Sequence, residues 1–515
     1  MNFKLLGKII GKIMILEGIL MLAPLAVSII YRESVAHVLA FIIPTVILAA
    51  IGTALQFLKP ERSSLYQKEG FALVALVWII MTLFGALPFV INRDIPNYID
   101  ACFEIMSGFT TTGASIIVDI TAMSHSTLFW RSFSHWIGGM GILAFVLIFI
   151  PESKDGSSMH LLRAESPGPQ VGKIVSKMKL TTGILYLIYF GLTVAEFTIL
   201  MLDAPIPGYE SEKVFFSMLA TFGCAGTGGF GFLPGSMELY SPFSQYVMAT
   251  FLYFFGINFG LYYLILIGKL RDVIRSEEFK TYLLIVVVSV SLIFVSLYFR
   301  LGNMTGSYTA EEAFRHAYFQ VASIMTTAGF TTADYNLWPM LAKTLLVALA
   351  FVGGMAGSTA GGMKTSRLVI AVKGAYINVR KLINPRYVPK AKIEGKTLEE
   401  DTINSVFSFI TLYFFIIIAT LIVLSVDPIN GQTVVISSEA GVGEYEVTHG
   451  FFTNFSAAVS CISNVGPGFE AVGPYASYAL YNPISKIFLT LLMLTGRLEI
   501  LPVLILFNHR TWKKI

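Results

Sequence analysis

Long apolar segments separated by short polar ones follow one another along almost the entire chain. A helix needs roughly 20 predominantly apolar residues to cross the hydrocarbon core of a bilayer. Segments of this kind predict ten membrane-spanning helices, at 13–31, 37–57, 70–91, 128–150, 181–202, 242–268, 281–299, 338–372, 403–425 and 478–507. The pattern therefore predicts an all-α integral membrane protein.

Shorter apolar stretches lie between the third and fourth, fifth and sixth, seventh and eighth, and ninth and tenth of these segments. Each is too short to cross a bilayer, and each ends in a glycine-rich turn. Irregular backbone is tolerated at membrane depth only where it is buried in protein or lines a wet cavity. We therefore predict re-entrant helices that end inside the membrane.

The order of span, short helix, glycine-rich turn and span occurs four times. The turns are TTTGAS at 110–115, GTGGFG at 226–231, TTAGFT at 326–331 and NVGPG at 464–468. Repetition on this scale predicts similar units around an axis. The predicted units are an N-terminal two-helix pair at 1–66 and pore repeats at 67–160, 161–275, 276–395 and 396–515, the third with an intramembrane loop.

The composition agrees with one membrane-embedded body. Of the 515 residues, 55% are hydrophobic and 13% are charged, and the mean hydropathy is +0.71. Soluble chains carry about 25% charged residues. The cysteines Cys102, Cys224 and Cys461 lie far apart without metal-ligand spacing, so we expect packed side chains rather than a disulfide framework or zinc site.

The basic residues indicate the orientation. Most Lys and Arg fall in the even-numbered gaps between the predicted spans, and the densest run is at 380–396. Cytoplasmic loops carry such an excess, so both termini are predicted to be cytoplasmic. This bias explains the basic runs without a nucleic-acid partner, although the 373–396 loop is also a candidate docking site for a cytosolic protein. The first apolar segment is long enough to span, which favours a retained helix over a cleaved signal peptide.

Glycine-rich turns at the ends of four short helices suit a path for a dehydrated cation. Backbone carbonyls can replace the hydration shell of K⁺, glycine allows the unusual backbone angles that aim them, and the preceding helix presents its partly negative end. The predicted filter residues are Thr111, Thr112, Gly113, Thr227, Gly228, Thr327, Ala328, Gly329, Asn464, Val465 and Gly466.

The narrowest ring is predicted at one glycine of each turn together with the residue before it. K⁺ would be held by the backbone carbonyls of Thr112, Gly113, Thr227, Gly228, Ala328, Gly329, Val465 and Gly466. Acidic residues follow three turns, at Asp119, Asp334 and Glu470. On the extracellular side they either raise the local cation concentration or are solvated loop acids.

A second glycine-rich segment, at 353–364, interrupts the eighth span. We predict a flexible gate below the filter, formed by Gly353, Gly354, Gly357, Gly361, Gly362, Lys364 and Arg497, with a static kink as the alternative. Intramembrane charges usually face a wet interior or a partner. Arg497 is therefore expected in the pore as an electrostatic barrier, or else in an ion pair with Glu499 or another acid. Glu104, Arg131 and His135 are predicted to have structural roles.

Nucleotide-binding motifs are matched only formally. The turn at 226–231 fits GxGxxG, but no strand of a βαβ unit precedes it, and the Walker-like end of the 353–364 segment has the wrong spacing. A membrane enzyme is disfavoured, because the spans contain no nucleophile–base pair, HExxH motif or cluster of His and carboxylates. An ion-coupled secondary transporter of an organic solute remains the alternative, although such folds usually place one site between two halves.

Taken together, the four turns, the GGMAGSTAGGMK run at 353–364 and Gly496-Arg497-Leu498-Glu499 resemble the Trk/Ktr/HKT superfamily of potassium transporters. The resemblance covers nearly the whole chain, and the two additional N-terminal helices are similar to the TrkH branch. It implies gated potassium uptake across a bacterial-type inner membrane. It also implies that Gly113, Gly228, Gly329 and Gly466 are the filter glycines, that 353–364 is the gate and that Arg497 is the pore arginine.

The resemblance implies partners as well. Members form homodimers and bind a cytosolic RCK-type protein similar to TrkA, which carries nucleotide, so this chain is expected to bind no cofactor beyond K⁺ or its surrogate Rb⁺. Sodium-preferring plant members have serine in place of the first filter glycine, so Gly113 implies a preference for K⁺. One departure is the second turn, where Gly223, Gly226, Gly228, Gly229 and Gly231 leave the register open.

Overall fold

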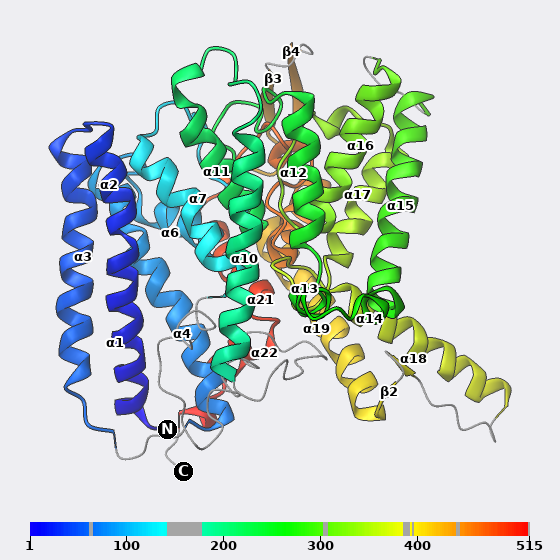
Figure 1. The fold of residues 1–515 in the computed structure, drawn as a ribbon, viewed down its shortest axis with the longest axis horizontal. Coiled ribbons are helices and arrows are strands. Elements are labelled where there is room, and N and C mark those ends of the chain that lie inside the picture. The colour runs from blue at the N-terminus through cyan, green and yellow to red at the C-terminus, as the bar shows by residue number, and fades with distance from the viewer. Residues whose placement is uncertain are drawn as a thin grey trace.

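The computed structural model describes residues 1–60, 65–141, 178–301, 307–384, 392–393, 396–438 and 443–512. Most of them lie in helices that run roughly parallel through the body (Figure 1). Six are long and apolar enough to cross a membrane, at Phe3–Ile30, Val35–Gln56, Lys68–Ile91, Leu180–Leu200, Glu277–Tyr298 and Glu400–Ser425. The protein is therefore an all-α, multi-pass membrane protein, as predicted.

The N-terminal helices form two closely packed spans at one edge of the body, the first made of two helical segments (Figure 1). They are α1 (Phe3–Leu20), α2 (Leu22–Ile30) and α3 (Val35–Gln56). A β-carbon on Gly11 of α1 would lie 2.7 Å from the carbonyl oxygen of Gly52 on α3. Glycine at this crossing lets the two backbones approach closely, as small residues do between membrane helices.

Each of the four following units contains a short helix whose C-terminal end leads into a glycine-rich turn. The first unit comprises α4 (Gln67–Gly85), α5 (Leu87–Ile91), α6 (Tyr98–Phe109) and α7 (His125–Gly139). The second comprises α10 (Met178–Leu200), α11 (Lys213–Gly226), α12 (Pro242–Phe255), α13 (Phe259–Leu266) and α14 (Leu270–Arg275). The short helices of these units are α6 and α11.

The third and fourth units repeat this order with larger insertions. The third comprises α15 (Glu277–Tyr298), α16 (Ala310–Met325), α17 (Met340–Val352) and α18 (Thr365–Ile383). The fourth comprises α19 (Glu400–Ser425), α20 (Phe451–Ser463), α21 (Pro483–Arg497) and α22 (Leu501–Phe507). Short 3₁₀ turns lie at Glu210–Glu212, Tyr335–Leu337, Glu470–Val472, Tyr478–Leu480 and His509–Thr511.

Three of the predicted spans are broken, and of these breaks only the one in the eighth span was predicted. The segment at 242–268 bends by 90° between α12 and α13. The segment at 338–372 is interrupted between α17 and α18, and the last one between α21 and α22, where Glu499 and Ile500 adopt φ of 55° and 69°. Hydropathy averages over such breaks, because the residues that form them remain apolar. The part of the fourth segment at 142–150 lies outside the described residues.

Two small β-hairpins accompany the helices and were not predicted. β3 (Thr433–Ser438) pairs antiparallel with β4 (Gly443–Thr448), and β1 (Lys392–Ile393) pairs with β2 (Lys396–Thr397). The β3–β4 hairpin lies at one end of the body (Figure 1). The rings of Phe3 and Trp512 stack with centroids 6.4 Å apart, so both ends of the described chain lie together at the opposite end.

Candidate functional site: a ring of four glycine turns

All four short helices end with the same backbone motif. One or two residues beyond the last helical residue the backbone turns left-handed, with φ of 54° at Thr111, 53° at Thr227, 58° at Thr327 and 58° at Asn464. The backbone N–H of the residue after this left-handed one donates a hydrogen bond to the carbonyl oxygen of the residue five positions earlier. The N···O distance is 2.8 Å in the first unit, 2.9 Å in the second, 2.7 Å in the third and 2.9 Å in the fourth. This is a Schellman ending, which satisfies carbonyls at the helix terminus.

Two residues after the left-handed position, each turn has a glycine with positive φ. The angles are 80° at Gly113, 62° at Gly229, 86° at Gly329 and 103° at Gly466. The second turn therefore differs by one residue from the predicted register: Gly229 is equivalent to Gly113, and Gly228 is equivalent to Thr112. The difference arises because neighbouring glycines share the same conformational freedom, so the sequence does not identify which one turns.

These glycines close a ring of backbone contacts around one axis. A β-carbon on Gly113 would lie 2.0 Å from the carbonyl oxygen of Gly228, and one on Gly229 would lie 1.9 Å from that of Ala328. One on Gly329 would lie 2.1 Å from the Val465 oxygen, and one on Gly466 would lie 2.5 Å from the Thr112 oxygen. Each turn thus packs against the next, and the fourth returns to the first.

The ring places equivalent carbonyls from all four units beside one another. They belong to Thr112, Gly228, Ala328 and Val465. The carbonyl of Gly466, which was predicted as a ligand, instead accepts hydrogen bonds from Ser460 Oγ at 2.6 Å and the Tyr478 hydroxyl at 2.8 Å. Because the four preceding helices direct their partly negative C-terminal ends at this ring, the arrangement favours a cation.

A buried ion pair supports the outer side of the first two turns. Arg131 of α7 donates through Nε to Glu104 Oε1 of α6 at 2.8 Å, and both side chains are almost completely buried. Arg131 also donates to the Gly231 carbonyl at 3.0 Å, and Glu104 accepts the Ile116 N–H at 2.9 Å. The pair therefore connects the segments that follow both turns, which is a structural role.

Replacement of Glu104 by Ala is expected to lower stability substantially. Breaking one partner of a buried pair leaves an uncompensated charge and costs about 3–5 kcal/mol. Thermal unfolding of the purified protein in detergent measures this loss. Lys381→Ala is the matched control, because Lys381 and its partner Glu400 are exposed and such pairs contribute little. Equal unfolding temperatures for the two variants would contradict the assigned role.

The segment between α17 and α18, residues 353–364, is the one predicted as an intramembrane loop, and it folds back against two of the turns. Gly361 N donates to Thr327 Oγ1 at 2.6 Å, and Gly362 N donates to the Ser463 carbonyl at 2.9 Å. Positive φ at Gly353, Gly357, Gly362 and Lys364 allows this path. The loop therefore lies directly against the start of the third and fourth turns.

Other contacts attach the intramembrane loop to the second unit and to itself. Met355 N donates to the Gly256 carbonyl at 3.0 Å, and Thr359 Oγ1 donates to the Phe255 carbonyl at 3.1 Å. The Lys364 ammonium binds the Ala360 carbonyl within the loop. A β-carbon on Gly354 would lie 2.6 Å from that of Ala360, so the fold of the loop is tight as well as anchored.

Arg497 joins the intramembrane loop to the first unit. Its guanidinium donates to the Thr359 carbonyl at 2.9 Å and to the carbonyls of Gly138 and Gly139, the latter also at 2.9 Å. Glu499 forms an ion pair with Arg367 of α18. Residues from all four units thus meet beneath the ring, with the charge of Arg497 among them.

The acids that follow the turns occupy different environments. Asp119 is exposed, and hydrogen bonds from Thr121 lower the pKa of its carboxyl. Asp334 is buried and accepts a hydrogen bond from the Tyr445 hydroxyl of β4 at 2.5 Å; burial raises the pKa of this carboxyl. Glu470 accepts from Thr453 Oγ1 at 2.8 Å. Asp334 and Glu470 therefore hold neighbouring segments, while Asp119 is a solvated loop acid.

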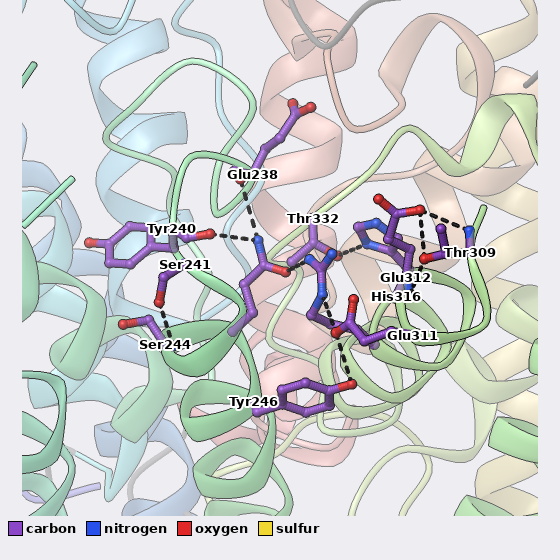
Figure 2. A network of polar contacts seen from close by, with 12 residues as sticks. Glu238, Tyr240, Ser241, Ser244, Tyr246, Thr309, Glu311, Glu312, His316 and Thr332 are labelled. Atoms are coloured by element: carbon purple, nitrogen blue, oxygen red, sulfur yellow. Dashed lines mark hydrogen bonds and ion pairs between the residues drawn. The ribbon is translucent and has the colours of Figure 1, made fainter. Parts of the chain in front are cut away.

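A polar network joins α12 of the second unit to α16 of the third (Figure 2). Arg315 of α16 contacts Gln245 of α12 and donates to Glu311 at 2.9 Å. His316 Nδ1 lies 2.9 Å from Thr332 Oγ1, just beyond the third turn. The network fixes the short helix of the third unit against α12.

The formal nucleotide motifs belong to this same architecture. The GxGxxG match at 226–231 is the second turn of the ring, and the Walker-like residues join the intramembrane loop to α18. Among the described residues no group of three or more His, Cys, Asp or Glu is arranged to hold a metal ion. Cys224 and Cys461 are buried, and Cys102 is half-buried.

The fold and the ring define an integral membrane protein built from four helix–turn–helix repeats around one axis. Residues 37–514 match the family described as TrkH, cation transport protein, and the chain belongs to this family.

Proteins of known function are similar along the entire chain. The Trk system potassium uptake protein TrkH of Salmonella typhimurium is 32% identical over 520 residues, with 100% of both chains covered. The Trk system potassium uptake protein TrkG of Escherichia coli K12 is 29% identical, with 98% of this chain and 97% of that protein covered. The crystal structure of the potassium transporter TrkH from Vibrio parahaemolyticus aligns with a TM-score of 0.82 at 28% identity, with 100% of both chains covered.

Proposed function

We propose that this protein takes up potassium ions across the bacterial inner membrane through a gated, channel-like pore. The observation that carries the proposal is the closed ring, in which carbonyls of Thr112, Gly228, Ala328 and Val465 lie against the glycines of neighbouring turns. Carbonyl oxygens replace the hydration shell of K⁺. The relatives named as potassium uptake proteins and the TrkH potassium transporter structure support the same ion.

The intramembrane loop and Arg497 act as the gate in this proposal. The loop touches the third and fourth turns, and Arg497 spans from the Thr359 carbonyl to those of Gly138 and Gly139. In this proposal the guanidinium lies on the ion path and repels cations, and the loop, held against Thr327 and Ser463, blocks the route away from the ring. Conduction would therefore require these contacts to separate.

The proposed orientation places both termini in the cytoplasm. Phe3 stacks on Trp512, and α18, with Arg380 and Lys381 in its last turn, extends from the body at that same end (Figure 1). Basic residues favour the cytoplasmic side. A second copy of the chain and a nucleotide-carrying RCK-type protein are the partners that the resemblance implies, and the cytoplasmic face is where the latter would bind.

The first test is cation flux into proteoliposomes that contain only this protein, with K⁺, Rb⁺, Na⁺ and Li⁺ compared. We expect K⁺ and Rb⁺ to enter far faster than Na⁺ and Li⁺, because the ring brings backbone carbonyls from four turns together and such carbonyls can replace the hydration shell of K⁺. Empty liposomes provide the control. Equal flux of all four cations would contradict the proposal.

A closed gate must be distinguished from the absence of a pore. The Arg497→Ala variant is therefore measured beside the native protein, since it removes the charge beneath the ring. Absence of K⁺ flux in both proteins would favour the alternative, an ion-coupled secondary transporter of an organic solute. Four equivalent turns in one ring argue against that alternative, because such transporters usually have a single site between two halves.

A further inference from the structure

The second turn lacks a side chain at a position where the other three turns have one. Thr112, Ala328 and Val465 are equivalent to Gly228, whose φ is not in the left-handed region, so a side chain would be conformationally allowed there. The space is instead occupied by His135 of α7. A β-carbon on Gly228 would lie 2.2 Å from both Cγ and Nδ1 of the His135 ring.

Both ring nitrogens of His135 form hydrogen bonds with backbone groups, one next to the first turn and one in the second turn. Its Nδ1 lies 2.8 Å from the Gly108 carbonyl near the end of α6, and its Nε2 lies 3.3 Å from the Phe230 N–H. The peptide N–H can only donate, so Nε2 is the acceptor and Nδ1 carries the proton donated to Gly108. The ring is completely buried and packs against the Phe230 ring, with centroids 4.3 Å apart.

Glycines on α7 and on the helices that it contacts allow α7 to approach the first two turns this closely. A β-carbon on Gly226 would lie 2.3 Å from the His135 carbonyl oxygen, and one on Gly108 would lie 2.1 Å from Ser134 Oγ. One on Gly138 would lie 1.8 Å from the Phe109 oxygen. The packing of α7 thus explains two glycines of the second turn, Gly226 and Gly228.

We propose that His135 is a positioning residue of the ion filter: its imidazole replaces the missing side chain of the second turn and holds the Gly228 carbonyl in the ring. This inference rests on the proposed function. The Gly228 oxygen lies against Gly113 of the first turn, so a displacement of the second turn changes the ring at two units. His135 does not touch the ion and acts through backbone groups at Gly108 and Phe230.

The first experiment compares His135→Leu and His135→Gln by K⁺ and Na⁺ flux in proteoliposomes. Leucine fills the space but accepts no hydrogen bond, and we expect the K⁺/Na⁺ flux ratio to fall by about tenfold. Glutamine offers an oxygen to the Phe230 N–H, so its ratio should lie closer to that of the native protein. His125→Leu, at the distant end of α7, is the matched control and should keep the native ratio.

The second experiment uses Gly228→Ala alone and together with His135→Ala. The single Gly228→Ala change drives a methyl group into the imidazole and should reduce selectivity. Removing the ring as well makes room for the methyl group, so the double variant should have a higher K⁺/Na⁺ ratio than Gly228→Ala. This pair decides the question if the variants with a substitution at residue 135 alone do not fold.

Two outcomes would overturn the inference. One is a native K⁺/Na⁺ ratio in His135→Leu, including the case in which total flux falls while the ratio is unchanged. The other is a double variant no more selective than Gly228→Ala. A native protein that itself fails to discriminate between K⁺ and Na⁺ would instead refute the proposed function, so the two failures are distinguishable.

Discussion

Replacement of Arg497 by Ala is expected to raise K⁺ flux by about tenfold or more. The guanidinium donates to the carbonyls of Thr359, Gly138 and Gly139, and so joins the intramembrane loop to the first unit. Hydrogen bonds to charged groups contribute about 1.5–3 kcal/mol each, and about 1.4 kcal/mol corresponds to a factor of ten in an equilibrium. Their loss is expected to shift the protein toward a state with the loop displaced, and it also removes a positive charge from the proposed ion path.

Flux assays at equal protein density measure this effect, with Arg380→Ala as the matched control. Arg380 is exposed on α18, where its guanidinium lies over the Tyr376 ring at 5.1 Å, so its loss should leave flux unchanged. Deletion of several residues within 355–362 should raise flux in the same direction as Arg497→Ala. Unchanged or abolished flux in well-folded variants would show that the loop does not block the pore.

The membrane architecture was predictable because each membrane-spanning helix is a long apolar segment of the sequence. Every predicted span coincides with a helix or a broken helix, apart from the portion at 142–150 that lies outside the described residues. The breaks in the helices after Phe255, Val352 and Arg497 were harder to predict from the sequence. Of these, the glycine-rich break at 353–364 was predicted, because glycine runs are visible in sequence, whereas the break at Leu498–Ile500 depends on positive φ at residues that rarely adopt it.

The four turns of the site could be predicted from the sequence, but the residues that pack behind them could not. The repeated Thr and Gly residues identified four turns, yet the register of the second one depends on which of two adjacent glycines turns left-handed. Glu104, Arg131 and His135 lie on helices whose facing directions the sequence does not specify. Arg131 and His135 contact Gly231 and Phe230 of the second turn, which lie 100 and 95 residues further along the chain, and contacts over such separations are not visible in the sequence.

Replacement of Gly113 by Ser is expected to reduce discrimination of K⁺ over Na⁺ while the protein still folds. The added β-carbon would lie 2.0 Å from the Gly228 carbonyl oxygen and 3.4 Å from that of Ala328, and φ of 80° is unfavourable for a residue with a side chain. The neighbouring carbonyls must therefore move, and the four oxygens can no longer surround the ion evenly. A fall of about tenfold in the K⁺/Na⁺ flux ratio corresponds to only about 1.4 kcal/mol, less than such a displacement is expected to cost.

Gly208→Ser separates the effect of the ring from that of backbone strain. Gly208 has φ of 83°, close to that of Gly113, but a β-carbon there would meet nothing within 4 Å. It lies in the segment between α10 and α11, away from the ring, so its replacement should cost stability without changing selectivity. Competition of Na⁺ with Rb⁺ uptake in proteoliposomes reports the ratio for both variants. An unchanged ratio in a folded Gly113→Ser protein would remove Gly113 from the filter, because no arrangement of the ring accommodates the side chain without moving a carbonyl.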